Sequence, residues 1–431
     1  MSTAATQAPS HFSTPDRPTW DLYSRCVHCG LCLNYCPTYR ALGLEADSPR
    51  GRIYQVLQVD AGRLSIGDSF VQHLDRCLGC RACETACPSG VKYGAILERA
   101  RAEIDANYKR PSNEERVRAY FYNKVLRNPQ VMMRWARLMR FYQHSGLQWM
   151  TRNLGILKLL GLEKLEAVSP RIDDRFFVDE IGQTFAPQGE VRARVAFMAG
   201  CIANVAFAEL NRKTIRVLNE NGVLVYVPKE QGCCGALHDH AGKLEDSRVM
   251  ARNNIDALRN YAVDAIISNA AGCGAMLKEY DHLLANDPEY AAPARAFTLK
   301  VRDINEFLAQ LGLVPPRNKV AARITYQDPC HLAHGQGVRN APRELLKQIG
   351  AELVEMPRAD FCCGSAGTYN VTQNALSMQI LAAKMDDVQT TNANILATAN
   401  VGCMLQLRAG IQQRGLKMDV KHVIELLDEA Y

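Results

Sequence analysis

The sequence predicts an α/β protein with an α-helical N-terminal region followed by two repeated parallel α/β units. Two four-cysteine runs of identical spacing lie among helical patterns in the first ninety residues. From about residue 192, short β-rich runs alternate with helical patterns, which indicates consecutive βα units. The order of these runs then repeats, with Cys330 following Cys201 by 129 residues. The predicted domains are residues 1–110, a basic helical linker 111–190, a first repeat 191–315 and a second repeat 316–431.

The composition favours a folded cytoplasmic protein. The chain has 431 residues, 47% of them hydrophobic, enough for two or three domains. The N-terminus carries neither an apolar run nor a basic n-region, and no stretch of about 18 apolar residues occurs, so we expect a soluble or peripheral protein. Sixteen cysteines in such a chain should stay reduced. Metal or redox chemistry is therefore favoured over a disulfide framework.

Two cysteine runs share the spacing C-x2-C-x2-C-x3-C, each followed by proline, Pro37 or Pro88. Three thiolates on a curled chain can reach three irons of a [4Fe–4S] cube, and the fourth ligand comes from elsewhere. Zinc knuckles or inert buried thiols are the alternatives, but the third cysteine and the trailing proline favour iron–sulfur. The cysteines are Cys26, Cys29, Cys32 and Cys36 in the first run, and Cys77, Cys80, Cys83 and Cys87 in the second.

In two-cluster ferredoxins, the fourth cysteine of each run binds the other cluster. On that pattern, one cluster is held by Cys26, Cys29, Cys32 and Cys87, and the other by Cys77, Cys80, Cys83 and Cys36. Crossed ligation brings the clusters close together, as an electron relay needs. We therefore predict two [4Fe–4S] clusters in a ferredoxin-type domain.

The segment between the two runs has helical periodicity at Ile53 and Leu57. Arg50 and Arg52 lie in it. They either offset the negative charge of thiolate-ligated clusters, which raises the reduction potential, or lie on the surface in water.

The linker is basic and amphipathic. From Arg116 to Leu162 there are nine Lys or Arg residues and no Asp or Glu. One predicted helix carries an apolar face and several arginines on its other faces. It either lies on an anionic membrane or packs against a domain or subunit, and the absence of a nucleic-acid-binding signature argues against nucleic acid. The apolar residues are Met132, Trp135, Met139 and Tyr142, and the arginines are Arg134, Arg137 and Arg140.

Each α/β repeat has four cysteines that follow predicted strands, so they should meet at the carboxyl edge of a sheet. Adjacent cysteines of a "CCG" turn can both face one site if glycine gives the turn its freedom. Each set is either a third candidate metal or thiol site, such as a further iron–sulfur cluster, or a group of small packing residues. The sets are Cys201, Cys233, Cys234 and Cys273, and Cys330, Cys362, Cys363 and Cys403.

No substrate-converting machinery is recognisable. The sequence has no strand–GxGxxG–helix fingerprint, P-loop or acid–base constellation, and "GQGVRN" at 335–340 lacks the third glycine. We therefore assign no catalytic residue, and we expect no flavin or NAD on this chain.

The stretches "CVHCGLCLNYCPTYR", "SPRGRIYQV", "HLDRCLGCRACETACPSGV", "GCCGALHDH", "ARNNIDA", "GCGAMLKEY" and "CCGSAGTY" carry a family resemblance over nearly the whole chain. The chain resembles the iron–sulfur subunit of bacterial glycolate oxidase (glycolate dehydrogenase). The resemblance implies a helical ferredoxin domain followed by two Rossmann-like CCG units. It also implies a hetero-oligomer in which FAD-containing subunits oxidise glycolate to glyoxylate. Electrons then pass through this chain toward quinone or another acceptor, at the cytoplasmic side of the inner membrane.

One departure separates the chain from heterodisulfide reductase-like members of the wider CCG group. Those members end each repeat with C-x2-C and use five cysteines for an unusual cluster, whereas Ala270 and Asn400 stand at the earlier position here. A thiol enzyme of that kind is therefore disfavoured. The corresponding subunit of a lactate or anaerobic glycerol-3-phosphate dehydrogenase is a nearer alternative. An iron–sulfur redox sensor is disfavoured because no DNA-binding element is evident.

Overall fold

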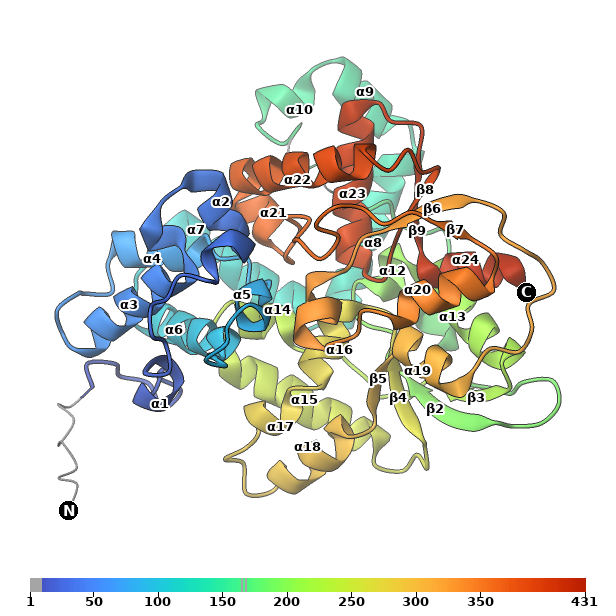
Figure 1. The fold of residues 1–431 in the computed structure, drawn as a ribbon, viewed down its shortest axis with the longest axis horizontal. Helices are drawn as coiled ribbons and strands as arrows, with labels where there is room; N and C mark the ends of the chain where they lie inside the picture. Colours follow the sequence, from blue (N-terminus) through green and yellow to red (C-terminus); the bar gives the residue numbers. More distant parts are fainter. Residues whose placement is uncertain (1–9, 164–165, 167–168) are drawn as a thin grey trace. The chain divides into compact units, whose positions relative to one another are not determined.

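A computed structural model describes residues 10–163, 166 and 169–431, and the chain divides into two units (Figure 1). Unit 1 comprises Met1–Ser112, described from residue 10, together with Leu237–Leu244. Unit 2 comprises Asn113–Ala236 and Glu245–Tyr431. The chain therefore returns from the first α/β repeat to unit 1 for eight residues before it completes that repeat.

Unit 1 is helical, and its described residues contain no strand, as the sequence predicts. The longer helices α3, α4 and α6 surround a core that includes Phe70, Leu74 and Ile96. Helix α3 begins where the Ser48 side chain accepts the Gly51 N–H, and Pro49 occupies the first turn. The elements are α1 Trp20–Tyr23, η1 Leu33–Tyr35, α2 Pro37–Leu42, η2 Glu45–Asp47, α3 Pro49–Asp60, α4 Asp68–Asp75, α5 Ala82–Thr85 and α6 Tyr93–Asn107.

The returning segment packs against α6 within unit 1. Arg101 Nη1 donates to the His240 carbonyl at 2.9 Å, and Lys243 Nζ lies 3.0 Å from Asp105 Oδ2. A Cβ at Gly242 would lie 2.3 Å from the Arg101 carbonyl oxygen, so only glycine permits this approach. Helix α14 (Ala236–His240) leads into this contact.

Unit 2 opens with the basic linker, which is helical. Asn128 caps α8 by accepting the N–H groups of Gln130 and Val131. The predicted amphipathic helix is present, but its faces differ from the expectation. Met132, Ala136 and Met139 face the core, whereas Trp135 points outward and donates its indole N–H to the Tyr120 hydroxyl. The elements are α7 Ser112–Tyr120, η3 Phe121–Leu126, α8 Pro129–His144, α9 Leu147–Asn153, α10 Ile156–Leu159 and η4 Phe177–Glu180.

The first repeat forms a five-stranded sheet in the order β1-β3-β2-β4-β5. Strands β2 to β5 are parallel, with Val195 opposite both Val225 and Ala265, while β1 is antiparallel to β3. All four residues of β4 are buried, as expected for a strand covered on both faces. The strands are β1 Thr184–Phe185, β2 Ala193–Phe197, β3 Val223–Tyr226, β4 Ala265–Ser268 and β5 Val301–Asp303.

The second repeat has the same topology. Its sheet is parallel, in the order β7-β6-β8-β9, which matches β3-β2-β4-β5 of the first repeat. Ile324 of β6 lies opposite Leu353 and Ile395. The strands are β6 Arg323–Tyr326, β7 Glu352–Leu353, β8 Ile395–Thr398 and β9 Asp419–His422. The predicted α/β fold with a duplicated parallel unit is confirmed.

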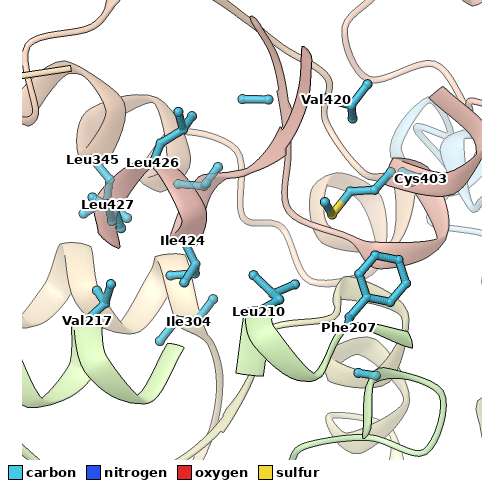
Figure 2. Packing of buried hydrophobic residues seen from close by; sticks show 14 of the residues in the cluster. Phe207, Leu210, Val217, Ile304, Leu345, Cys403, Val420, Ile424, Leu426 and Leu427 are labelled. Carbon is cyan, nitrogen blue, oxygen red and sulfur yellow. The ribbon is translucent and has the colours of Figure 1, made fainter. Parts of the chain in front are cut away.

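The two repeats share one apolar core through reciprocal helix packing. Helix α13 of the first repeat packs on α24 of the second, and α19 of the first packs on α20 of the second. Figure 2 shows Val217 and Leu210 on α13 facing Leu427 and Ile424 on α24. Each repeat therefore covers an apolar helix face that it could not bury alone.

The remaining helices complete the two repeats. They are α12 Ala203–Ala206, α13 Ala208–Glu220, α15 Leu244–Leu258, α16 Ala271–Leu277, α17 Tyr280–Leu283, α18 Ala291–Thr298, α19 Ile304–Leu311, η5 His331–Gly335, α20 Ala341–Gln348, α21 Tyr369–Thr372, α22 Asn374–Gln389, α23 Val401–Arg414 and α24 Val423–Ala430. Among the described helices, none is both long and apolar enough to cross a membrane.

Candidate metal centres

The two cysteine runs of unit 1 fold into loops of the same local shape. In the first run, His28 (φ 53°) and Gly30 (φ 85°) are left-handed, and in the second run Gly79 (φ 63°) and Arg81 (φ 61°) occupy the corresponding positions. Left-handed residues turn the chain tightly, and His28 and Arg81 adopt this conformation without being glycine. Loops of this shape curl the first three cysteines of each run around a common point.

Cys77, Cys80 and Cys83 gather with the fourth cysteine of the other run, Cys36. All four are buried, and all four line one small cavity. Burial raises the pKa of the Cys83 thiol far above its usual range, and the sulfurs of the other three raise it further. The fourth residue of the first run thus belongs spatially to the second run.

The remaining four cysteines form a more exposed group. Cys26, Cys32 and Cys87 are half-buried, and Cys29 is exposed. Burial raises the pKa of Cys26, and the nearby sulfurs of Cys87 and Cys29 raise it further. Burial likewise raises the pKa of Cys32 to about 11, and the nearby sulfurs of Cys26 and Cys36 raise it further. Cys32 therefore lies between the two groups.

Two hydroxyl groups contact the sulfurs of the buried group. The Tyr93 hydroxyl donates to Cys77 Sγ at 3.5 Å, whereas Thr38 Oγ1 lies 3.2 Å from Cys36 Sγ and donates its proton to the Asp47 carbonyl at 2.8 Å. Hydrogen bonds to ligand sulfurs are among the features by which proteins tune iron–sulfur potentials.

Arg52 is fully buried beside the same cavity. Its Nη1 and Nη2 both donate to Thr38 Oγ1 at 3.1 Å, its Nε donates to the His73 carbonyl, and its Nη2 lies 3.2 Å from Asp47 Oδ1. Burial alone would lower the pKa of Arg52, but Cys77, Tyr93, Cys36 and Asp47 hold that pKa above its usual value. A permanent positive charge therefore lies next to the four sulfurs.

Arg50 has a different environment. It pairs with Glu45 at 2.7 Å and donates to the His28 carbonyl at 3.0 Å in the first cysteine loop, with its side chain 30% exposed. Arg52 therefore has the position expected of a residue that offsets the charge of the thiolates. Arg50 is partly hydrated and supports the first cysteine loop.

The four cysteines of the first repeat also converge, and they lie at the carboxyl edge of the sheet as predicted. Cys201 Sγ lies 3.6 Å from Cys233 Sγ. Hydrogen bonds with Cys233 and Cys273 raise the pKa of Cys234, and burial raises it further. The "CCG" turn therefore directs both adjacent thiols toward one point.

The second repeat reproduces this arrangement. A hydrogen bond with Cys362 raises the pKa of Cys330, and burial raises it further. The contact with Cys362 lowers the pKa of Cys363, but a hydrogen bond with Cys403 and burial outweigh it, so this pKa is also raised. Both predicted sets of four are thus brought together.

The surroundings of the two sets differ. Lys384 is buried on α22 and donates to the carbonyls of Arg358 and Ala359 at 2.7 and 3.2 Å. Asn254 stands at the corresponding place on α15 and donates to the Cys233 carbonyl. His331, with Nδ1 3.5 Å from Cys330 Sγ, takes the place of Ile202.

The residues that replace the fifth cysteine are helix N-caps, Ala270 for α16 and Asn400 for α23. The Asn400 side-chain amide lies 3.3 Å from Cys403 Sγ, where it donates a hydrogen bond to the sulfur. An amide donor thus occupies the space beside the fourth thiol of the second repeat.

The buried group and the exposed group of unit 1, and the four-cysteine sets of the two repeats, all suit a thiophilic metal centre. Thiols with raised pKa values stay protonated together unless a metal cation compensates their charge. The sulfur donor set favours zinc or iron–sulfur over hard cations. In unit 1 a three-cysteine loop plus one cysteine of the other run is the ligand pattern of two-cluster ferredoxins, in which each set would hold one cube.

Sequence reasoning missed Thr38, Tyr93, Asp47 and Lys384. Thr38 follows the Cys36–Pro37 step directly, which is a local signal. Tyr93, Asp47 and Lys384 come close to the sulfur groups only through tertiary packing. Neither their residue type nor their local sequence indicates this proximity.

Comparison with known proteins agrees with this geometry. Residues 23–91 match the 4Fe-4S dicluster domain, residues 195–278 and 324–408 match the cysteine-rich domain, and residues 113–169 match the linker region of the glycolate oxidase iron-sulfur subunit. The probable glycolate oxidase iron-sulfur subunit of Bacillus subtilis (strain 168) is 41% identical over 94% of this chain and 93% of its own length. The chain belongs to the glycolate oxidase iron–sulfur subunit family.

Other relatives fit this membership. The glycolate oxidase iron-sulfur subunit of Escherichia coli (strain K12) is 34% identical over 94% of this chain and 93% of its own. Lactate utilization protein A of Oceanobacillus iheyensis is 29% identical over 54% of this chain and 96% of its own. The predicted family resemblance is confirmed, and the dicluster match confirms an iron–sulfur protein of this family.

The "CCG" turns give a stability prediction. Gly364 has φ +91°, and a Cβ there would lie 2.6 Å from the Ser377 carbonyl oxygen, whereas Gly415 has φ +59° and open space around it. Gly364→Ala should destabilise the protein by about 2 kcal/mol more than the control Gly415→Ala, because strain and overlap combine. Thermal unfolding of both variants measures this difference, and equal unfolding midpoints would contradict the tight turn.

Proposed function

We propose that this chain is the electron-transfer subunit of a glycolate oxidase complex. FAD-containing partner subunits oxidise glycolate to glyoxylate, and their electrons pass through this chain toward quinone at the cytoplasmic side of the inner membrane. The observation that carries the proposal is the crosswise grouping of eight sulfurs in unit 1. Such grouping suits two neighbouring one-electron carriers.

The ligands follow the two groups. One [4Fe–4S] cluster is held by Cys26, Cys29, Cys32 and Cys87, and the other by Cys36, Cys77, Cys80 and Cys83. When bound, each cluster supplies a carrier for single electrons. Cys32 and Cys36 hold different clusters although one turn of 3₁₀ helix, Leu33–Tyr35, separates them. This short covalent span keeps the two ligand sets close.

The protein around the buried set lowers the energy of its reduced state. Arg52, which Thr38 helps to hold in place, contributes a fixed positive charge, and the Tyr93 hydroxyl donates to the sulfur of Cys77. Each of these groups stabilises additional negative charge on the ligand sulfurs.

The CCG repeats are the second part of the proposal. The four sulfurs of each repeat form a site for a further metal centre, with an iron–sulfur cluster as the occupant at one repeat or more. The convergence of Cys201, Cys233 and Cys234 with Cys273 supports this, as does the matching set around Cys363. With four thiols and no fifth, an ordinary four-ligand centre fits best.

A related 2-hydroxy acid is the second candidate substrate of the partner subunits. The similarity to lactate utilization protein A over about half the chain favours lactate as that alternative. The substrate pocket lies on the partner, so the acid oxidised by the co-purified complex decides between the two.

Replacing Cys29 or Cys80 by Ser should reduce glycolate-dependent reduction of a quinone analogue by the assembled complex at least about a hundredfold, because each removes a cluster ligand. The FAD content of the partner subunits should stay unchanged. Unaltered quinone reduction in both variants would exclude a relay role.

Electron paramagnetic resonance of the reduced, anaerobically prepared protein tests separately which cysteines hold the same cluster. Cys87→Ser should alter the same cluster signal as Cys29→Ser, and Cys36→Ser the same signal as Cys80→Ser. The opposite grouping would refute the crossed ligand sets while leaving the relay intact.

Arg52→Met should lower the midpoint potential of the cluster at Cys36, Cys77, Cys80 and Cys83 by at least about 60 mV, or about 1.4 kcal/mol, because a buried positive charge is lost. Tyr93→Phe, which removes the hydrogen bond to Cys77 Sγ, should shift it in the same direction by less. The matched control Arg50→Met should leave this potential nearly unchanged. Redox titration followed by paramagnetic resonance measures all three, and an unchanged potential in Arg52→Met would rule out the electrostatic role.

Cys234→Ala and Cys363→Ala should each remove the metal centre of one repeat. Metal analysis of the wild-type protein should give about eight irons for the two cubes and about twelve if one repeat is filled. Loss of about four irons in one variant identifies the repeat that holds the cluster, whereas loss of zinc identifies a structural site. Unchanged metal content and activity in both variants would reduce these cysteines to packing residues.

A further inference from the structure

The helices α8, α9 and α10 of the linker expose an unusual number of large apolar side chains. Leu159 is 86% exposed, Trp149 72%, Leu154 67% and Leu160 61%. Soluble surfaces normally carry such side chains singly, so a dense group marks an interaction surface. We call the group the linker apolar surface; it comprises Trp135, Leu138, Phe141, Leu147, Trp149, Met150, Leu154, Leu159, Leu160 and Leu162.

Positive charge is interleaved with this surface. Arg134 and Arg137 are exposed on α8 beside Trp135 and Leu138, and Lys158 is exposed on α10 beside Leu159. Within the described part of the chain, none of these three residues forms an ion pair. The stretch from Arg116 to Leu162 has no acidic residue at all. Among the described residues, these three cations therefore have no acidic partner, and the apolar side chains beside them are largely exposed.

A cationic cavity adjoins the same helices. Its volume is about 490 Å³. The lining includes Gln143 and His144 of α8, Arg152 of α9, Arg408 of α23, and Arg171, which precedes η4. Glu166 is its acidic member, and it is bound by Arg152 at 2.8 Å. Arg171 and Arg408 remain as positive groups for an anion of phosphate size.

Interleaved cations and apolar side chains suit a lipid interface better than a protein interface. The cores of protein–protein interfaces are depleted in charged residues, particularly lysine, because each buried cation needs an acidic partner. A layer of anionic headgroups offers anions and water to Arg134, Arg137 and Lys158, while the adjacent acyl boundary accepts leucine and tryptophan. Tryptophan is enriched at that boundary.

We propose that α8, α9 and α10 form a monotopic docking surface for an anionic phospholipid bilayer. Trp149, Leu154, Leu159 and Leu160 insert at the boundary between headgroups and acyl chains. Arg134, Arg137 and Lys158 bind lipid phosphates, and a headgroup occupies the adjacent cationic cavity. The docking does not depend on the clusters, so loss of electron transfer in the cysteine variants would leave it intact.

Flotation of the full-length, anaerobically purified chain with lipid vesicles tests the proposal. The chain should float with vesicles of phosphatidylcholine and phosphatidylglycerol, and not with pure phosphatidylcholine. Trp149→Ser combined with Leu159→Ser should weaken partitioning at least about tenfold, as should Arg134→Glu combined with Arg137→Glu. Leu299→Ser, at a leucine 75% exposed elsewhere in unit 2, and Arg259→Glu are matched controls that should float like the wild type.

The outcomes separate the two kinds of partner. Equal flotation of the two paired variants and the wild type overturns the proposal. A wild-type chain that does not bind anionic vesicles overturns it as well. Variants that float normally but no longer co-purify with the flavoprotein identify a subunit interface and also overturn it. Weaker flotation of both paired variants, with retained flavoprotein binding and thermal stability, supports lipid docking.

Discussion

The structure depends on bringing buried sulfur atoms together at points that the backbone must fix in advance. Burial and mutual proximity raise the pKa values of thiols such as Cys83 and Cys234, so each group is stable as thiolates only around a metal cation. In unit 1 the loops that hold these sulfurs are short and irregular, and the helices α3 and α6 supply the core on which they rest. Folding of this unit and insertion of its cofactors are therefore coupled processes.

The duplicated half of the protein follows a different rule, because its scaffold does not depend on the sulfur groups. The pairs α13 with α24 and α19 with α20 bury a shared apolar core at a distance in sequence from the "CCG" turns. Because this core holds the scaffold without the sulfur groups, the residues around the two sulfur sets can differ without loss of the fold. Lys384 gives the second set a buried cation where Asn254 gives the first a neutral amide. The two sets therefore differ in electrostatic environment although their backbone geometry is the same.

Much of this was predictable because its determinants are local. The curl of the chain around the first three cysteines of each run follows from the cysteine spacing, and strands such as Ala265–Ser268 follow from short apolar runs. Features set by distant residues were not predictable. The burial of Arg52 requires His73 and Asp47 from other segments, and the exposure of Trp135 follows from which neighbours cover α8. Nothing local marks Leu237–Leu244 as part of unit 1, since its contacts there, such as the close approach at Gly242, are made with residues distant in the sequence.

The unequal burial of the two sulfur groups gives a direction to the proposed relay. Electron exchange with a partner protein requires its cofactor to approach closely, and the group with exposed Cys29 and half-buried Cys26 permits that approach. The group around Cys83 is enclosed within unit 1, which shields it from solvent, and it faces the positive charge of Arg52. If the enclosed group holds a cluster, Arg52 would favour its reduced state, so the exposed group would be the entry side of the proposed relay and the enclosed group its next site. The short span between Cys32 and Cys36 keeps the proposed entry set and the enclosed set close to each other, as the proposed relay requires.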